Sequence, residues 1–297
     1  MNEFLQQLIN GFSLGSIYAL IALGYTMVYG VLRFINFAHS DVFMVGSFAG
    51  YYLSRHFPRE SFGGGLMVLA GAMVICAALG VIIERFAYRP LRNHSKLNVL
   101  ITAIGVSLLL ENTGQFVFGA APKAFPVLFP VKSFTFMGSL VLSTSQIAVL
   151  IVTAVLLFSL RFIVLKTRMG TAMRAVSFNP VAASLVGINN DMVISFTFAL
   201  GSALAAAGGI LYSLNYQAID PLMGILPGLK AFVAAVLGGI GNIPGAALGG
   251  LLLGVVETFV NGSRWSTYTD AIAFAVLILI LLFKPAGLLG KLQVEKV

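Results

Sequence analysis

Two stretches of the sequence contain the residue types of a hydrolytic site. Gly11–Gly15 reads G-x-S-x-G, the pattern in which a strained strand-to-helix turn exposes a nucleophilic serine, here Ser13. His39, Ser40 and Asp41 supply a base, a hydroxyl and an acid, but contiguous side chains on a helix point in different directions. The first stretch begins an apolar helix, so its two glycines are better explained as G-x-x-x-G helix packing. The sequence therefore predicts no hydrolase.

Neither a metal site nor a cofactor is predicted for this chain. The three histidines, His39, His56 and His94, are expected in separate loops with no cysteine or carboxylate at a metal-ligand spacing. The single cysteine, Cys76, lies in an apolar run and is expected to pack as a small hydrophobic side chain. The sequence has no G-x-x-x-x-G-K-[ST] phosphate-binding loop, so any ATPase must be a separate subunit.

Glu111 is the acidic residue expected deepest inside an apolar segment, where a charge costs at least about 2.5 kcal/mol on insertion scales. Asn112 follows it and Gln115 lies one helical turn later, which predicts a polar stripe facing the bundle interior or a cavity. We expect Glu111 and Asn112 to line a translocation pathway, or Glu111 to anchor the bundle through a polar partner. A single isolated acid argues against an ion-coupled carrier, which would use several such groups.

The loop of about residues 165–191, predicted on the cytoplasmic side as the coupling loop, contains the signals of a short capped helix. Asn179 is a favourable N-cap, Pro180 suits the first helical position, and Gly187 is placed for a left-handed C-cap. These signals predict a helix over residues 181–186. Such a helix suits the docking of a separate ATPase subunit, although a packed connector would use the same caps.

A second short helix is expected over residues 172–176, just before the capped one, and it carries Arg174.

The composition predicts the elements that must position these residues. Of the 297 residues, 59% are hydrophobic and 9% are charged, whereas a soluble domain carries about 25% charged residues. Lipid must therefore surround most of the chain. The formal net charge of +8 is explained by basic inner loops and anionic lipid headgroups, and no nucleic-acid partner is predicted. An N-terminus on the outer side places most of the Lys and Arg residues inside.

We predict an all-α polytopic membrane protein with about eight transmembrane segments, one of them broken, and residues 1–297 as a single transmembrane domain. The predicted segments run over residues 5–32, 41–53, 66–83, 99–118, 141–165, 192–214, 229–260 and 271–283.

The segment of about residues 229–260 is the broken one. Gly238–Gly245 places four glycines and a proline within eight residues, which interrupts a helix. Two half-length helices that enter and leave on one side are predicted, with a single kinked span as the alternative. Irregular backbone at membrane depth is tolerated where it lines a cavity. The candidate pathway residues here are Gly239, Gly241, Asn242 and Pro244.

Ordered motifs along essentially the whole chain carry a resemblance to a known family. They are residues 15–24 (GSIYALIALG), 28–32 (VYGVL), 35–39 (INFAH), 174–183 (RAVSFNPVAA), 187–188 (GI), 237–245 (LGGIGNIPG) and 283–290 (FKPAGLLG). Together they resemble the permease subunits of high-affinity branched-chain amino acid (leucine, isoleucine, valine) ABC importers.

The resemblance implies a multi-pass protein of the bacterial inner membrane that is not itself an enzyme. The implied partners are two ATPase subunits, which would hold ATP and Mg, a second related permease, and a periplasmic substrate-binding protein. Ala182, Ala183 and Gly187 are similar to the coupling motif of ABC importers, in which Glu-Ala-Ala is followed after three residues by Gly. Val181 stands where that motif has Glu, so a charge contact there is in doubt.

Other functions stay open at this stage. Related permeases serve urea, amides and sugars, and no residue here can be assigned to a substrate. An ion-coupled carrier or a passive channel is the other class of function that this architecture allows.

Overall fold

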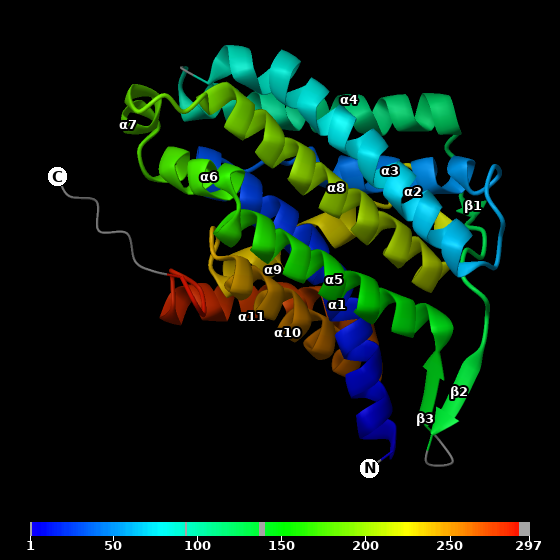
Figure 1. The fold of residues 1–297 in the computed structure, drawn as a ribbon. Helices are drawn as coiled ribbons and strands as arrows, with labels where there is room; N and C mark the ends of the chain where they lie inside the picture. Colours follow the sequence, from blue (N-terminus) through cyan, green and yellow to red (C-terminus); the bar gives the residue numbers. More distant parts are fainter. Residues whose placement is uncertain (1, 93, 137–139, 291–297) are drawn as a thin grey trace.

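The computed structural model describes residues 2–92, 94–136 and 140–290, and its elements are almost all helices (Figure 1). In chain order the helices are α1 Asn2–Leu32, α2 His39–Leu53, α3 Phe62–Ile83, α4 Lys96–Phe118, α5 Thr144–Lys166, α6 Arg168–Phe178, α7 Pro180–Leu185, α8 Asn190–Tyr216, α9 Ile225–Gly238, α10 Ile243–Asn261 and α11 Thr269–Phe283. A π-turn, Glu84–Tyr88, and a 3₁₀ turn, Arg89–Leu91, continue α3, and a 3₁₀ turn, Ser266–Tyr268, precedes α11.

Seven helices among the described residues are long and apolar enough to cross a membrane. They are α1, α3 with its two following turns, α4, α5, α8, α10, and α11 with its preceding turn. With the 15-residue α2 and the 14-residue α9, they account for the eight predicted segments and confirm the all-α membrane fold. Because lipid leaves backbone groups without water, each span satisfies its own hydrogen bonds as a helix.

Four short strands lie outside the spans. β2 Ser133–Phe136 pairs antiparallel with β3 Leu140–Ser143, and β1 Lys123–Ala124 pairs with β4 Ala218–Ile219. The prediction that the fifth span begins at residue 141 was therefore wrong. Ser143 and Gln146 form a capping box, in which each side chain bonds the other residue's backbone amide, so the helix begins at Thr144.

The two ends of the helix bundle can be told apart by the short elements that lie there. The β2–β3 strands lie near the N-terminus at one end, and α7 lies at the other (Figure 1). These ends are called the strand end and the α7 end below. Gln6 joins α1 to β3, since its amide nitrogen donates to the Val141 carbonyl and its amide oxygen accepts from the Val141 amide.

Most of α1 and α8 is buried, and small residues allow close helix contacts. A Cβ atom placed on Gly15 would lie 2.7 Å from Leu251 Cα, and one on Gly11 would lie 2.8 Å from Val255 Cα. Both neighbours belong to α10. The G-x-x-x-G packing predicted for these glycines is therefore confirmed.

His39 was expected in a loop, but it is the first residue of α2 and is buried. Its Nε2 atom lies 3.2 Å from the Ile21 carbonyl oxygen of α1. The sequence prediction began this helix at residue 41, where the apolar pattern starts. Polar residues at a helix end resemble a loop in sequence, so His39 was assigned to the preceding loop. The ring packs beside Tyr25, with ring centroids 4.6 Å apart, so it serves to join α1 and α2.

Candidate functional site

The predicted capped helix in the loop of residues 165–191 is present as α7. The Asn179 side-chain oxygen accepts hydrogen bonds of 3.0 Å from the amides of Val181 and Ala182, which satisfies two of the free amides at the helix start. Pro180 occupies the first helical position, where no amide hydrogen is needed. Local sequence signals thus fix where this helix begins.

The end of α7 is also fixed by its backbone. Gly187 has a φ of +86°, the left-handed conformation that favours glycine. Its amide donates to the Ser184 carbonyl, and the Ile188 amide donates to the Ala183 carbonyl, both at 3.0 Å. These two bonds form a Schellman motif, which closes the helix one residue earlier than the predicted Val186.

The outward face of α7 and its flanks is apolar and has no cover within the described residues. The exposed fractions are 87% for Phe178, 67% for Val181, 83% for Leu185 and 77% for Val186. Ala182 is exposed on the same helix, whereas Ala183 is buried against the chain. The α7 patch is the name used below for the four exposed side chains of Phe178, Val181, Leu185 and Val186. Clustered exposed apolar side chains of this kind mark an interaction surface.

Polar contacts fasten α7 and its neighbour α6 to the spans. The Asn190 side-chain amide of α8 donates to the Pro180 carbonyl at 2.8 Å. The Ser177 hydroxyl of α6 donates to the Gly30 carbonyl of α1 at 2.5 Å, and Arg33 donates to the Ser177 carbonyl at 3.3 Å. These bonds connect α7 to α8 and α6 to α1.

Arg174 lies on α6, which at Arg168–Phe178 is longer than the predicted helix over residues 172–176. Its guanidinium donates to the Val164 carbonyl at the C-terminal end of α5 and to the Thr171 hydroxyl. A cation at this position also interacts favourably with the negative end of the α5 dipole. The described contacts of Arg174 thus hold α6 against α5.

An ionic network lies at the same end and joins the end of α3 to the start of α8. Arg92 bonds Glu84 and Asp191, and Arg89 also bonds Asp191. The Ser195 hydroxyl donates to Glu84 at 2.6 Å. Burial lowers the pKa of the Arg92 guanidinium, and the neighbouring Glu84 carboxylate opposes that shift. Arginine stays charged at neutral pH, so this network stiffens the α7 end.

The broken segment turns between α9 and α10, as its glycines predicted. Gly239 and Gly241 have φ values of +104° and +91°. Asn242 caps α10, accepting from the Gly245 amide at 3.2 Å, and donates to the Leu289 carbonyl at 2.7 Å. Two helices of half length were expected, but the two helices are unequal in length, since α9 has 14 residues and α10 has 19.

The candidate pathway residues of the turn have unequal surroundings. A Cβ atom placed on Gly239 would lie 2.5 Å from the Gly290 amide nitrogen, so Gly239 is packed against the C-terminal segment. Gly241 and Pro244 are exposed. The turn lies at the α7 end, because the nearest atom to a Cβ on Gly241 is Gly30 Cα at 3.9 Å. The part this turn plays in a pathway stays a prediction.

The polar stripe expected on α4 is only partly turned inward. Glu111 is half-buried, one turn after Ser107, whose hydroxyl donates to Asp41 of α2 at 2.5 Å. Asn112 is exposed, and its side chain donates back to the Leu108 carbonyl at 2.7 Å. Neighbouring helical residues face different directions, so Asn112 does not share the face of Glu111.

Glu111 and Asn112 on α4 are also separate from the other pathway candidates. The α4 contacts named above are made with α2, whereas the α9–α10 turn packs against the C-terminal segment. The structure thus does not bring the two groups of predicted pathway residues into one site.

The sequence reasoning missed an ion cluster in the broken segment. Lys230 of α9 lies 2.7 Å from Glu257 of α10 and 2.7 Å from Asp270 of α11. Lys230 and Glu257 are buried. Glu257, which is 4% exposed, is more buried within the protein than the half-buried Glu111, whereas the depth of Glu111 in the membrane stays a prediction. The sequence does contain a signal for this ion pair, because a lysine and a glutamate, Lys230 and Glu257, occur in the same interrupted apolar segment, where charges are costly unless they are paired.

Metal-ligating clusters of three or more His, Cys, Asp or Glu side chains do not occur in residues 2–92, 94–136 and 140–290. The candidate functional features of the described chain are the capped α7, its polar links to the spans, and the broken segment.

The family model and three similar proteins all carry the description of branched-chain amino acid transport permeases. Residues 7–281 match the family described as "Branched-chain amino acid transport system / permease component". The chain is 45% identical to the high-affinity branched-chain amino acid transport system permease protein BraD of Pseudomonas aeruginosa, over 99% of this chain and 98% of BraD. The corresponding LivH of Escherichia coli K12 is also 45% identical, with the same coverage. A probable LivH of Methanocaldococcus jannaschii is 30% identical over 91% of this chain and 88% of that protein.

Proposed function

The chain belongs to the family of branched-chain amino acid transport system permease components, and from that premise we propose that it carries leucine, isoleucine and valine across the bacterial inner membrane. The names of BraD and LivH support this substrate class, since each is 45% identical to nearly the whole chain. Permeases for urea or amides remain a less favoured alternative, because the closely similar relatives are named for branched-chain amino acids.

The energy for transport comes, in this proposal, from separate ATPase subunits. The sequence contains no phosphate-binding loop of its own. The single observation that carries the proposal is the α7 patch: a short helix, capped at Asn179 and Gly187, presents exposed apolar side chains on one end of the bundle. A complete assembly has two ATPases, a second related permease and a periplasmic substrate-binding protein.

The mechanism we propose is alternating access driven through α7. ATP binding closes the two ATPases, and α7 moves with them as a rigid unit because both of its ends are fixed by hydrogen bonds. The bond from Ser177 to Gly30 passes the movement to α1, and the bond from Asn190 to Pro180 passes it to α8. The spans then repack, and the substrate released by the binding protein moves inward.

Val181 occupies the position where the coupling motif of ABC importers has Glu. Its side chain is exposed and apolar, so this contact with the ATPase is hydrophobic in the proposal rather than ionic. The other exposed members of the α7 patch provide the same chemistry.

Purification of the tagged chain from its native membrane in mild detergent tests the proposed assembly. Mass spectrometry is expected to find two ATPases and a second permease in stoichiometric amounts. The purified assembly, with the binding protein, is expected to accumulate labelled leucine in liposomes only when ATP is present. A chain that purifies alone, or leucine uptake that persists without ATP, contradicts the proposal.

A further inference from the structure

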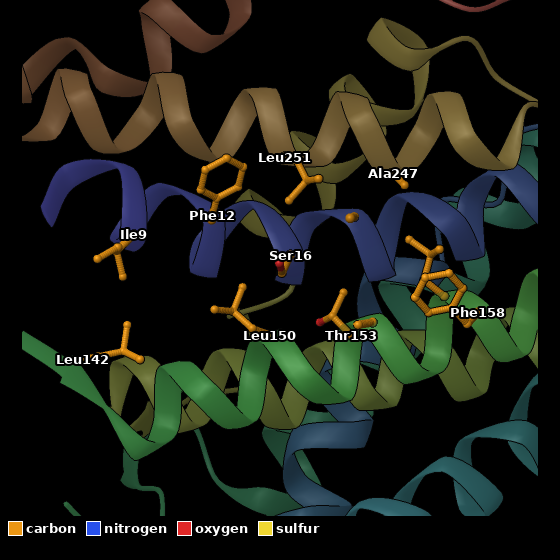
Figure 2. Close-up of a pocket in the computed structure, with 12 residues that line it drawn as sticks. Ile9, Phe12, Ser16, Leu142, Leu150, Thr153, Phe158, Ala247 and Leu251 are labelled. Atoms are coloured by element: carbon orange, nitrogen blue, oxygen red, sulfur yellow. The ribbon is translucent and has the colours of Figure 1, made fainter. Parts of the chain in front are cut away.

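A groove of about 470 Å³ lies between α1, α5 and α10 (Figure 2). Its walls are mostly apolar and include Phe12 of α1, Leu150 and Leu157 of α5, and Leu251 of α10. A cavity of this size is within the range of sites for small molecules, and apolar walls with few polar groups are typical of such sites.

Two hydroxyl groups face each other within these apolar walls. Ser16 of α1 and Thr153 of α5 are only 4% and 5% exposed, and Figure 2 shows both side chains in the space between α1 and α5. Thr153 Oγ1 is buried and has no hydrogen-bond partner among the described residues. A buried hydroxyl without a partner is unfavourable, so this position calls for a group that is not part of the described chain.

Buried threonines of the described chain differ in their hydrogen bonding, and Thr26 of α1 is unpaired like Thr153. Thr197 and Thr258 each donate 2.8 Å bonds to the carbonyl four residues earlier, which is the usual partner of a helical threonine. Thr153 lies in the middle of a helix and makes no such bond with Val149. Its hydroxyl oxygen is therefore buried and unpaired at a residue that lines the groove.

The groove also lies where movement of α7 would change its shape. The α5 helix ends at Lys166 and leads through Thr167 directly into α6, so α5 is one of the two spans, with α8, that the α7 loop connects. The opposite wall consists of α1 and α10, and α10 is the second arm of the broken segment. The groove extends from Ile9 and Leu142 at the strand end toward Phe158 and Ala247 (Figure 2).

We propose that this groove is a substrate site that binds the aliphatic amino acid in transit. The branched side chain contacts the leucine and phenylalanine walls, and the Thr153 and Ser16 hydroxyls donate hydrogen bonds to the substrate carboxylate. None of the twelve lining residues is charged. This inference rests on the proposed function and names the residues through which it operates.

The first test compares Thr153→Val with Thr153→Ser in the complete importer, reconstituted in liposomes with its binding protein. The valine variant keeps the shape of threonine but has no hydroxyl. Loss of one such bond is expected to raise the KM for transported leucine about three- to tenfold, and the serine variant is expected to restore it. Equal KM values for wild type and both variants overturn the proposal.

The second test fills the groove. Ala154 lines it, whereas the neighbouring Val155 is exposed on another face of α5 and is not part of the lining. Ala154→Phe is expected to lower leucine uptake at least about tenfold and alanine uptake much less, because the larger side chain is excluded first. Val155→Phe serves as the matched control and is expected to transport both normally. A uniform loss of uptake for both amino acids in Ala154→Phe argues for misfolding of the groove walls and overturns the size selection.

The third test measures occupancy directly with Thr153→Cys in a Cys76→Ala background. Leucine added to the complete importer is expected to slow the reaction of this cysteine with a small thiol reagent, and glutamate is not. Protection by lipid or by the second permease, without an effect of leucine, assigns the groove to packing and overturns the proposal. A wild-type importer that does not take up leucine is a failure of the proposed function, whereas normal wild-type uptake with unaffected variants is a failure of the groove alone.

Discussion

The Ser177 hydroxyl donates a 2.5 Å hydrogen bond to the Gly30 main-chain carbonyl, which fastens the last turn of α6 to the last turn of α1. Gly30 Cα is in turn the nearest atom to a Cβ placed on Gly241 of the α9–α10 turn. The loop that carries α7, the most buried span and the broken segment therefore meet at one point. In the proposed mechanism, movement of α7 acts on all three.

Ser177→Ala removes this bond without changing the backbone. We expect leucine uptake by the reconstituted importer to fall about two- to tenfold, in line with the loss of one hydrogen bond of 0.5–1.5 kcal/mol, while ATP hydrolysis continues. The ratio of leucine transported to ATP hydrolysed is the quantity to measure. Ser184→Ala is the control, since that hydroxyl bonds only the Val181 carbonyl within α7. An unchanged ratio in Ser177→Ala contradicts transmission through this contact.

Gly187→Val tests the rigidity of α7. A side chain at Gly187 meets no atom within 4 Å, so the change acts only through the backbone, whose φ is +86°. A β-branched residue there is strained by roughly 1–2 kcal/mol, and the Schellman motif is expected to open. ATP hydrolysis is expected to continue while uptake is lost. Gly187→Asn tolerates positive φ and is expected to stay coupled; normal coupling in the valine variant argues against α7 as a rigid lever.

The features that sequence predicted well are those fixed by near neighbours. Asn179, Pro180 and Gly187 define α7 because capping depends on backbone groups only two to four residues away. The break between α9 and α10 follows in the same way from the glycines of residues 238–245. The helical packing of Gly11 and Gly15 needed only their four-residue spacing.

The features that sequence missed depend on distant partners. Lys230 meets Glu257 only because α9 and α10 fold back on each other, and Asp270 joins them from a third helix. Ser16 and Thr153 come from α1 and α5, and neither has a sequence signal that pairs it with the other. The half-burial of Glu111 could not be predicted from its apolar neighbours in sequence, because they do not show which face of α4 packs in the bundle.

Lys230→Met is expected to destabilise the protein by about 3–5 kcal/mol, because it leaves the buried Glu257 carboxylate without its cationic partner. The midpoint of thermal unfolding in detergent is the measurement. Lys284→Met is the control, since that lysine is exposed and has no ion pair among the described residues. If the single variant unfolds at the wild-type temperature, the cluster does not hold the broken segment.

The double variant Lys230→Met, Glu257→Gln distinguishes the cost of an unpaired buried charge from the cost of altered side-chain packing. Removing both charges leaves no unpaired ion in the apolar segment, so most of the stability is expected to return. Asp270→Asn is expected to have a small effect, since the Asp270 side chain is half exposed and water can replace the ion pair.

The last prediction concerns the α9–α10 turn as part of the pathway. Gly241→Cys and Pro244→Cys place thiols at exposed positions, whereas a cysteine at Gly239 would meet the Gly290 backbone. In a Cys76→Ala background, we expect both cysteines to react with a small polar thiol reagent at rates that differ between the ATP-bound and nucleotide-free importer. The reason is that this turn contacts α1 where the α7 loop is fastened, so repacking of the spans changes its exposure. Gly63→Cys, exposed near the start of α3 at the strand end, is the control and is expected to react equally in both states. Equal rates in both states at Gly241 and Pro244 assign the turn to static packing rather than to the path of the substrate.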